Sequence, residues 1–252
     1  PPAFFCNTRV ELDPIALLCS NSTMPQPTPA ILFDLDGTLV DSFTDIAASA
    51  NYALFAMGLP TQDQDVIRLC VGRGLIVLVE RLIPDATEAT LHEMIGHFRE
   101  HYGEHMLDTT RPYPGMVELL DAVEAGGLDR AVVSNKPERY VLEILKGLGL
   151  RERFASVVGG DSAGKKKPHP AALSLSVTRA RDAGRPIAPA AFVGDGPEDL
   201  GAAKLLEVPF FAVTWGHSSA EAWGELGDGE HLVQTMDELQ TGLLALAPEG
   251  GP

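Results

Sequence analysis

Basic residues are scarce in this sequence, which has 19 Lys and Arg against 35 Asp and Glu and a formal net charge of −16 over 252 residues. Proteins that bind nucleic acids or anionic membrane surfaces use clustered Lys and Arg side chains, because these neutralise phosphate groups. The charge balance therefore argues against a nucleic-acid partner and against a membrane partner. An acidic chain that acts on an anionic ligand must gather its few cations where that ligand binds.

Cysteine is also rare, with three residues (Cys6, Cys19 and Cys70) and no C-x-x-C spacing. This odd number argues against a disulfide framework and against a zinc site, and it predicts a reducing, cytoplasmic location. Long apolar runs are missing too. The run at residues 75–79 is far shorter than the roughly 20 residues that a membrane-spanning helix needs.

The first 23 residues lack the basic start and the continuous apolar stretch of a signal peptide, and they show no clear period. Met24, followed by Pro-Gln-Pro-Thr-Pro, resembles a natural start just ahead of the first apolar run. We therefore expect residues 1–28 to be an N-terminal extension outside the fold.

The sequence does contain an ordered succession of apolar patterns. A short apolar run at residues 30–33 predicts a buried strand. Helical periodicity follows without an intervening strand candidate, at residues 44–57, 63–69, 75–82 and 87–102. Strands and helices then alternate: helices are expected at 117–124, 140–148, 170–183 and 198–206, and strands at 130–133, 155–158, 190–193 and 210–213.

This alternation predicts an α/β fold with a Rossmann-like parallel sheet flanked by helices, because strands separated by single helices form βαβ units. The helical block between the first strand and the rest predicts an inserted all-helical cap domain. We expect the catalytic core to comprise residues 29–42 and 112–252, and the cap to comprise residues 43–111.

Two acidic residues, Asp34 and Asp36, directly follow the first predicted strand. Side chains alternate along an extended chain, so both would point to the same side. Gly37 allows the backbone to turn tightly, and Thr38 offers a hydroxyl and an amide to a phosphate oxygen. Parallel sheets bind ligands beyond the carboxyl ends of their strands, which is where these residues fall. An Asp- and Gly-rich turn without function is the alternative for this stretch alone.

Three later stretches extend the pattern: Ser134-Asn135 at the end of a predicted strand, the segment 165–170 before a predicted helix, and the segment 192–199 around another strand end. Together the four stretches resemble, in order, the motifs of the haloacid dehalogenase-like hydrolase superfamily. The resemblance runs from about residue 29 to the C-terminus. One departure is Gly196, which stands where members often have Ser or Thr; this removes a possible hydrogen bond but no metal ligand.

The resemblance implies a Mg²⁺-dependent phosphatase that works through an aspartyl-phosphate. In such an enzyme Asp34 attacks phosphorus, and Asp36 protonates the leaving group and then activates water. The implied Mg²⁺ ligands are Asp34, the backbone carbonyl of Asp36, and Asp195. Asp199 would hold a metal-bound water or Lys167.

The resemblance also implies the groups that bind phosphate. Ser134 would donate a hydrogen bond to a phosphate oxygen, aided by backbone amides of Asn135 and of the Gly37–Thr38 loop. Lys167 would contact both Asp34 and the phosphate. The alternatives are that Ser134 merely begins a helix and that the lysines at 165–167 form a solvated loop.

Other reactions of the superfamily fit less well. Dehalogenases expel a halide that needs no proton and usually lack the second acid, so Asp36 favours phosphoryl transfer. No lysine precedes Lys136, so the expected cap lacks the lysine of phosphonoacetaldehyde hydrolases and phosphoglucomutase-like enzymes. A non-catalytic phosphate-sensing or protein-binding relative is the alternative of another class, although the nucleophile and metal-ligand positions are all present.

Longer stretches look like the bacterial phosphoglycolate phosphatase family, which implies 2-phosphoglycolate as substrate. They lie at residues 71–74, 111–115, 134–137, 167–170 and 211–216. The carboxylate of that substrate requires a cation, and Arg73 in the glycine-rich stretch of the expected cap is the candidate. A solvent-facing Arg73 is the alternative. Other small phosphorylated metabolites, such as a sugar phosphate or pyridoxal phosphate, stay open, and the sequence does not predict an oligomeric state.

Overall fold

The computed structural model describes residues 26–218 and 220–248. The predicted extension falls almost entirely outside these residues, but strand β1 begins at Thr28, one residue before the expected start of the core. Within the described ranges, no helix combines the length and the apolar character that crossing a bilayer requires.

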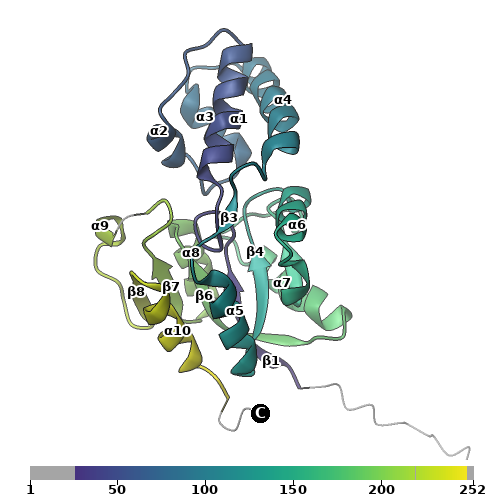
Figure 1. Cartoon of the computed structure of the whole chain (residues 1–252), viewed down its shortest axis with the longest axis vertical. Coiled ribbons are helices and arrows are strands. Elements are labelled where there is room, and N and C mark those ends of the chain that lie inside the picture. The colour runs from purple at the N-terminus through teal and green to yellow at the C-terminus, as the bar shows by residue number, and fades with distance from the viewer. Residues whose placement is uncertain (1–25, 219, 249–252) are drawn as a thin grey trace, which may run out of the picture.

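A six-stranded parallel sheet forms the lower part of the molecule (Figure 1), in the order β5-β4-β1-β6-β7-β8. β1 lies between β4 and β6, so that Phe33 pairs with Val132 on one side and with Val193 on the other. The strands are β1 (Thr28–Phe33), β4 (Asp129–Val133), β5 (Ser156–Val158), β6 (Ile187–Gly194), β7 (Phe210–Val213) and β8 (Glu230–Val233).

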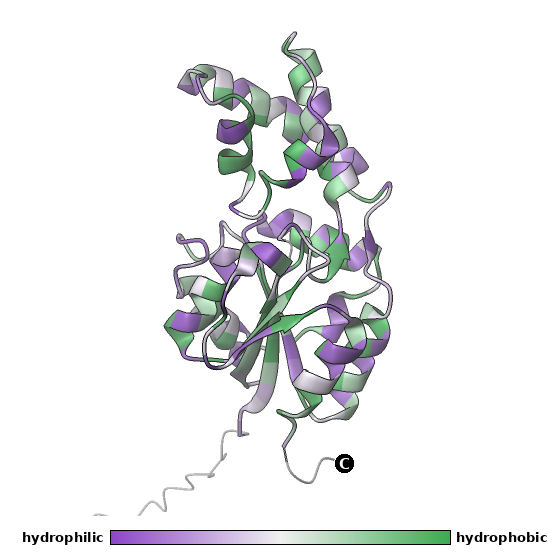
Figure 2. Ribbon diagram, turned by 90° about the vertical axis from the view of Figure 1, so that its left-hand side faces the viewer, coloured by the Kyte–Doolittle hydropathy of each residue, from purple (hydrophilic) through white to green (hydrophobic). Residues whose placement is uncertain are grey.

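Helices cover both faces of this sheet, because the residues of β1 alternate between two buried clusters. Ile31 and Phe33 pack in one cluster, and Ala30 and Leu32 in the other. The first cluster includes residues of α5 (Met116–Ala125), α6 (Glu138–Gly147) and α10 (Met236–Leu244), and the second includes residues of α7 (Ala171–Asp182) and α8 (Pro197–Leu206). The hydropathy colouring in Figure 2 shows the strands as a mainly hydrophobic layer inside these helices. The predicted Rossmann-like α/β fold is confirmed.

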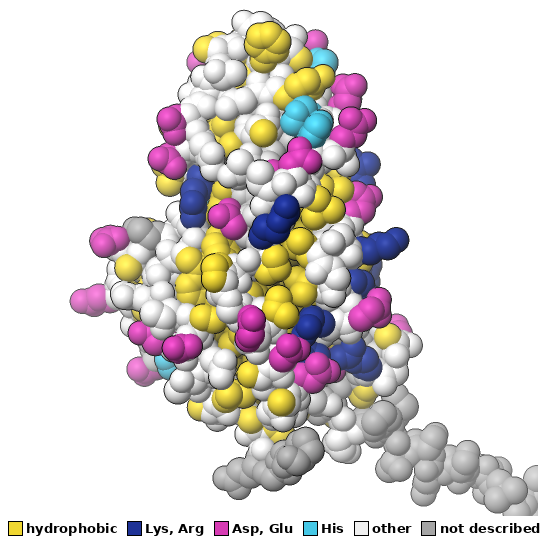
Figure 3. Space-filling view, viewed as in Figure 1, with side chains coloured by type: hydrophobic (Ala, Val, Ile, Leu, Met, Phe, Trp, Pro, Cys, Tyr) yellow, Lys and Arg dark blue, Asp and Glu magenta, His cyan; other side chains and the backbone are white. Residues whose placement is uncertain are grey.

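The helices between β2 (Val40–Asp41) and β3 (Arg111–Pro112) stand above the sheet and form the cap (Figure 1). They are α1 (Phe43–Ala56), α2 (Gln64–Arg68), α3 (Leu75–Leu82) and α4 (Glu88–His105), all within the range predicted for a helical cap. α1 packs against α4, and the Thr87 side chain begins α4 by accepting a hydrogen bond from the Thr90 amide. On the face shown in Figure 3, acidic side chains are spread over both the cap and the core, in keeping with the net charge.

Several short elements were not predicted. β2 and β3 pair antiparallel where the chain enters and leaves the cap. The chain after β7 forms α9 (Ala220–Trp223), β8 and α10. Earlier in the chain, a 3₁₀ turn, η1, covers Arg151–Arg153. The capping box of Thr235 and Glu238 at the start of α10 is a signal that the sequence did carry.

Asp45 fastens the first turn of α1 to the returning chain at the base of the cap. Its carboxylate is 3% exposed and accepts hydrogen bonds from the amides of Thr109 and Thr110, at 3.0 and 2.9 Å, and from both hydroxyls. Burial alone would raise the pKa of Asp45, but these hydrogen bonds outweigh it and hold the pKa below its ordinary value. The ionised carboxylate therefore stabilises the junction between cap and core.

The substitution Asp45→Asn should lower the free energy of unfolding by about 2–4 kcal/mol at neutral pH, because an amide cannot accept all of these hydrogen bonds. A lowered pKa contributes stability above the unfolded pKa of about 3.9, and this contribution disappears as the pH falls through the folded pKa. The difference between wild type and variant in urea unfolding should therefore shrink below about pH 4. Asp65→Asn, at an exposed position of α2, is the matched control. A loss no larger than that of the control would contradict the assignment.

Candidate active site

Three neighbouring strands bring chemically active side chains to one edge of the sheet. Asp34 directly follows β1, Ser134 directly follows β4, and Asp195 directly follows β6, which ends at Gly194. Because these strands are parallel and adjacent, their carboxyl ends meet at the same edge, below the cap. The register that pairs Phe33 with Val193 brings Asp34 and Asp195 into the same site.

Lys167 joins two of the carboxylates. Its ammonium nitrogen lies 2.8 Å from Asp34 Oδ1 and 2.7 Å from Asp199 Oδ1, and all three side chains are buried. Burial lowers the pKa of Lys167, but the charges of Asp199 and Asp34 more than compensate and raise it. Lys167 is thus held as a cation against Asp34. Lys165, in the same run, is exposed.

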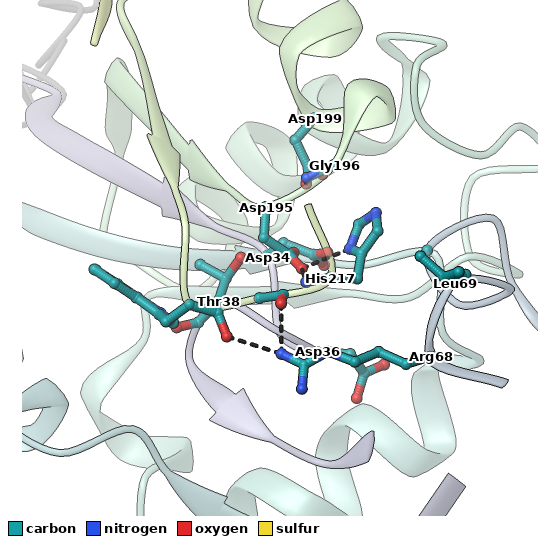
Figure 4. Close-up of polar contacts among 12 residues, drawn as sticks. Asp34, Asp36, Thr38, Arg68, Leu69, Asp195, Gly196, Asp199 and His217 are labelled. Atoms are coloured by element: carbon teal, nitrogen blue, oxygen red, sulfur yellow. Dashed lines mark hydrogen bonds and ion pairs between the residues drawn. The ribbon is translucent and has the colours of Figure 1, made fainter. Parts of the chain in front are cut away.

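Asp195 is fully buried and is fixed from two sides. Oδ1 accepts a hydrogen bond from the Thr38 hydroxyl at 3.1 Å, and Oδ2 accepts one from the His217 backbone amide at 2.8 Å. The His217 ring turns toward the same carboxylate (Figure 4), with Nδ1 2.6 Å from Oδ2. Gly37 is required here: it has φ +83°, and a Cβ at this position would lie 2.1 Å from Asp195 Oδ2.

The buried carboxylates form a set of donors that suits a hard divalent cation. One ligand oxygen each from Asp34, Asp195 and Asp199 lies within 4.8 Å of the others. Burial and the charge of Asp195 raise the pKa of Asp34, and burial raises that of Asp199 to about 7, although Lys167 opposes both shifts. Asp34 and Asp199 share one ammonium, while Asp195 contacts the His217 ring. The raised pKa values of Asp34 and Asp199 mean that their negative charge is disfavoured, which a divalent cation would offset. Asp195 Oδ1, which accepts from Thr38, keeps a second lone pair for a ligand bond, whereas Oδ2 already has two contacts from His217.

Asp36 lies beside this cluster with its side chain held by Lys136. The Lys136 ammonium is 2.8 Å from each Asp36 oxygen, and the Ser42 hydroxyl donates to Oδ1 at 2.5 Å. Burial lowers the pKa of Lys136, but the charge of Asp36 outweighs this effect and raises it. Asp36 therefore has a fixed orientation beside Asp34.

Ser134 and Asn135 lie close to this cluster. The Ser134 hydroxyl still has a hydrogen to donate, whereas the polar atoms of the Asn135 side chain are already hydrogen-bonded. The Ser134 hydroxyl accepts from the Lys136 amide at 3.3 Å and lines the cavity above Asp34. The Asn135 side chain instead bonds the backbone of Lys167 in both directions and donates to Gly72 O at 3.1 Å. Asn135 thus positions the lysine loop and touches the cap.

A cavity between cap and core opens over Asp34 and Asp36. Arg73 is not among the residues that line it. Its guanidinium pairs with Glu198 at 2.7 Å, and its side chain is 52% exposed. The structure therefore brings together all the predicted site residues except Arg73. The position of Arg73 gives no support to its predicted contact with the carboxylate of a substrate.

The cap also contacts the core directly through Arg68. From the end of α2 it donates to the backbone carbonyls of Trp215 and Gly216, at 3.0 and 2.5 Å (Figure 4), while its guanidinium lies over the Phe43 ring. The loop after β7 that carries His217 is thus tied to the cap as well as to Asp195.

The sequence did not identify Lys136, His217 or Tyr102 as site residues. Lys136 was visible as a residue next to Ser134 and Asn135, and a lysine in a predicted active-site loop was a usable signal. His217 lies 22 residues after Asp195, and Tyr102 lies 66 residues after Asp36. Only the tertiary fold brings these two side chains to the site.

Comparison with known proteins agrees with this geometry. Residues 31–213 match the family of haloacid dehalogenase-like hydrolases. The chain belongs to this family. It is 33% identical over 230 residues to a phosphoglycolate phosphatase of Escherichia coli, covering 83% of this chain and 90% of the relative. It is 32% identical over 223 residues to a phosphoglycolate phosphatase of Thiobacillus denitrificans, covering 86% and 96%.

A solved structure from Haemophilus somnus, described as a predicted phosphoglycolate phosphatase, has the same fold. It superimposes with a TM-score of 0.74 at 30% identity and covers 85% of this chain and 98% of its own. The predicted family and fold are therefore confirmed.

Proposed function

We propose that this chain is a Mg²⁺-dependent phosphatase that hydrolyses 2-phosphoglycolate, or a closely related small phosphate monoester, with Asp34 as the nucleophile. The observation that carries the proposal is the position of Asp34. It lines the cavity between cap and core while Lys167 and two further buried carboxylates surround it. The names of the relatives support the choice of substrate, and the cysteine content supports a cytoplasmic location.

The residues divide the chemistry between them. Asp34 attacks phosphorus while the bond between phosphorus and the ester oxygen breaks, and a protonated Asp36, released from its contacts with Lys136, would pass its proton to the departing alkoxide. A water molecule then attacks the phosphoryl group on Asp34 and gives its proton to Asp36. This step releases phosphate and restores both carboxyl groups.

The other charged groups reduce the repulsion between Asp34 and the phosphate dianion. Lys167 neutralises part of the charge of Asp34, and the Ser134 hydroxyl is free to donate to a phosphate oxygen. Asp34, the Asp36 carbonyl and Asp195 would hold the divalent cation, with Asp199 beside it. When bound, this cation supplies positive charge to the phosphate oxygens.

Removal of divalent cations tests the proposal. Phosphate release from 2-phosphoglycolate should stop in EDTA and return with excess Mg²⁺, because the carboxylates alone repel the substrate. A panel with glucose 6-phosphate and pyridoxal phosphate distinguishes the other metabolites. Activity that persists in EDTA would refute the metal dependence. Failure to hydrolyse any substrate in the panel with Mg²⁺ would favour the non-catalytic alternative.

A further inference from the structure

The cavity above Asp34 has an apolar wall formed by the cap. Ile46, Val71, Leu78 and Phe98 line it on this side. An apolar, water-poor wall strengthens electrostatic interactions inside the cavity, because little solvent screens them. The few polar groups that face the same space therefore determine which substituent of a substrate can be accommodated.

Tyr102, from α4, is the first of these groups. It is 1% exposed, it lines the cavity, and among the described residues its hydroxyl makes no hydrogen bond of acceptable geometry. The ring lies beside the Lys136 ammonium, which is 4.8 Å from its centroid. Since an ammonium is only a donor, the Tyr102 hydroxyl hydrogen lacks an acceptor, and a buried polar group in this state is costly.

The start of α3 is the second group. Gly74 caps this eight-residue helix without a side-chain hydrogen bond, its first turn has no acidic residue, and Gly74 and Leu75 line the cavity. The first amides of a helix have no acceptor within the helix, and the helix dipole makes this end positive. Lys166 adds to the charge, because its ammonium would lie 2.5 Å from a Cβ at Gly74, and it forms no ion pair in the part of the chain that the structure describes.

Lys136 is the third group. It donates hydrogen bonds to both Asp36 oxygens, and its third donor lies on the side of Tyr102, where it would be shared with a bound acceptor. Among the described residues that line the cavity, Tyr102, Lys136 and the start of α3 offer donors near the cap, whereas the charged acceptors, Asp34 and Asp36, lie at its floor. A sugar would bring hydroxyl groups that need acceptors as well as donors, but a carboxylate needs donors alone.

We propose that the Tyr102 hydroxyl, the Lys136 ammonium and the first amides of α3 form a subsite for a carboxylate on the leaving group of the substrate. This inference rests on the proposed phosphatase function. It assigns to these groups the binding of the substrate carboxylate, which the sequence had suggested for Arg73. The phosphate would bind at Asp34 and Ser134, and the carboxylate would lie toward the cap, where it supplies the missing acceptor for Tyr102.

Two substrates and two matched variants test the subsite. Ethyl phosphate has the carbon skeleton of 2-phosphoglycolate with a methyl group in place of the carboxylate. Tyr102→Phe should lower kcat/KM for 2-phosphoglycolate by about ten- to a hundredfold, the usual effect of losing a hydrogen bond to a charged group, and that for ethyl phosphate by less than about twofold. Tyr140→Phe is the control: Tyr140 lines the same cavity, but its hydroxyl already bonds Arg139 and the Arg99 carbonyl. It should leave the ratio of the two kcat/KM values unchanged.

Binding to the Asp34→Asn variant, measured by calorimetry, tests the subsite without turnover. 2-Phosphoglycolate should bind more tightly than ethyl phosphate, and Tyr102→Phe in this background should remove most of the difference. Equal binding of the two compounds, or an equal effect of Tyr102→Phe on both substrates, would overturn the subsite. If binding discriminates as expected but the wild-type chain hydrolyses neither compound, the proposed function fails and the subsite stands.

Discussion

Asp34→Asn should reduce phosphate release from 2-phosphoglycolate by at least about 10³-fold, because an amide can neither attack phosphorus nor accept the phosphoryl group. The substitution keeps the shape of a side chain that is almost completely buried at the end of β1. Burial raises the pKa of Asp34, which means that the fold disfavours its charge. Without a divalent cation, relief of this buried charge opposes the loss of the Lys167 ion pair, so the free energy of unfolding should fall by less than it does when Lys167 is removed. Steady-state assays and urea unfolding in EDTA measure the two effects.

A matched control separates the nucleophile from general charge effects. Asp182→Asn makes the same change at an exposed position at the end of α7, and it should leave the rate within about twofold of wild type. Mass spectrometry of the wild-type chain, quenched in acid during turnover, should detect a phosphoryl group on the peptide that contains Asp34. Retention of more than about a tenth of the activity by Asp34→Asn would exclude Asp34 as the nucleophile.

Lys167→Met should abolish most activity and also destabilise the fold. The Lys167 ammonium is the partner of both Asp34 and Asp199, and removing one member of a buried ion pair typically costs about 3–5 kcal/mol. We expect the free energy of unfolding to fall by about this amount, and kcat/KM to fall by at least about 10²-fold, since the charge of Asp34 would no longer be offset.

Lys165→Met provides the comparison, because it removes an exposed lysine two residues earlier in the same run. Its unfolding free energy should change by less than about 0.5 kcal/mol. Similar behaviour of the two variants would mean that the lysine run acts as a solvated loop, which the sequence had left as an alternative.

The order of strands and helices could be predicted from the sequence wherever apolar periodicity was strong. The predicted range for α3 coincides with the observed helix, and the other cap helices differ by only a few residues at their ends. The short pieces were missed for physical reasons. β8 has a single buried residue, Val233, and β2 and β3 are two residues long. None of the three strands therefore has an apolar alternation that the sequence could reveal.

The site could be predicted where its residues follow strand ends, because the parallel sheet alone brings Asp34, Ser134 and Asp195 together. Groups that neither follow a strand end nor belong to one of the four recognised motifs could not be predicted. Tyr102 reaches the cavity only because α4 packs beside α1, and His217 reaches Asp195 only because the loop after β7 folds back beneath Gly72. Arg73 shows the converse case: its glycine-rich loop was identified, but the direction of its side chain depends on Glu198, 125 residues later.

The pairing of β2 with β3 has a consequence for how such a chain can diversify. Val40 and Asp41 lie beside Pro112 and Arg111, so the polypeptide leaves the core and rejoins it at positions roughly 5 Å apart. A tight turn could bridge that gap, and a foreign segment with equally close ends could be transplanted there, while β1, β4 and β6 keep their register. New substrate preferences can therefore arise by exchange of the segment between these two strands, without rebuilding the catalytic carboxylates.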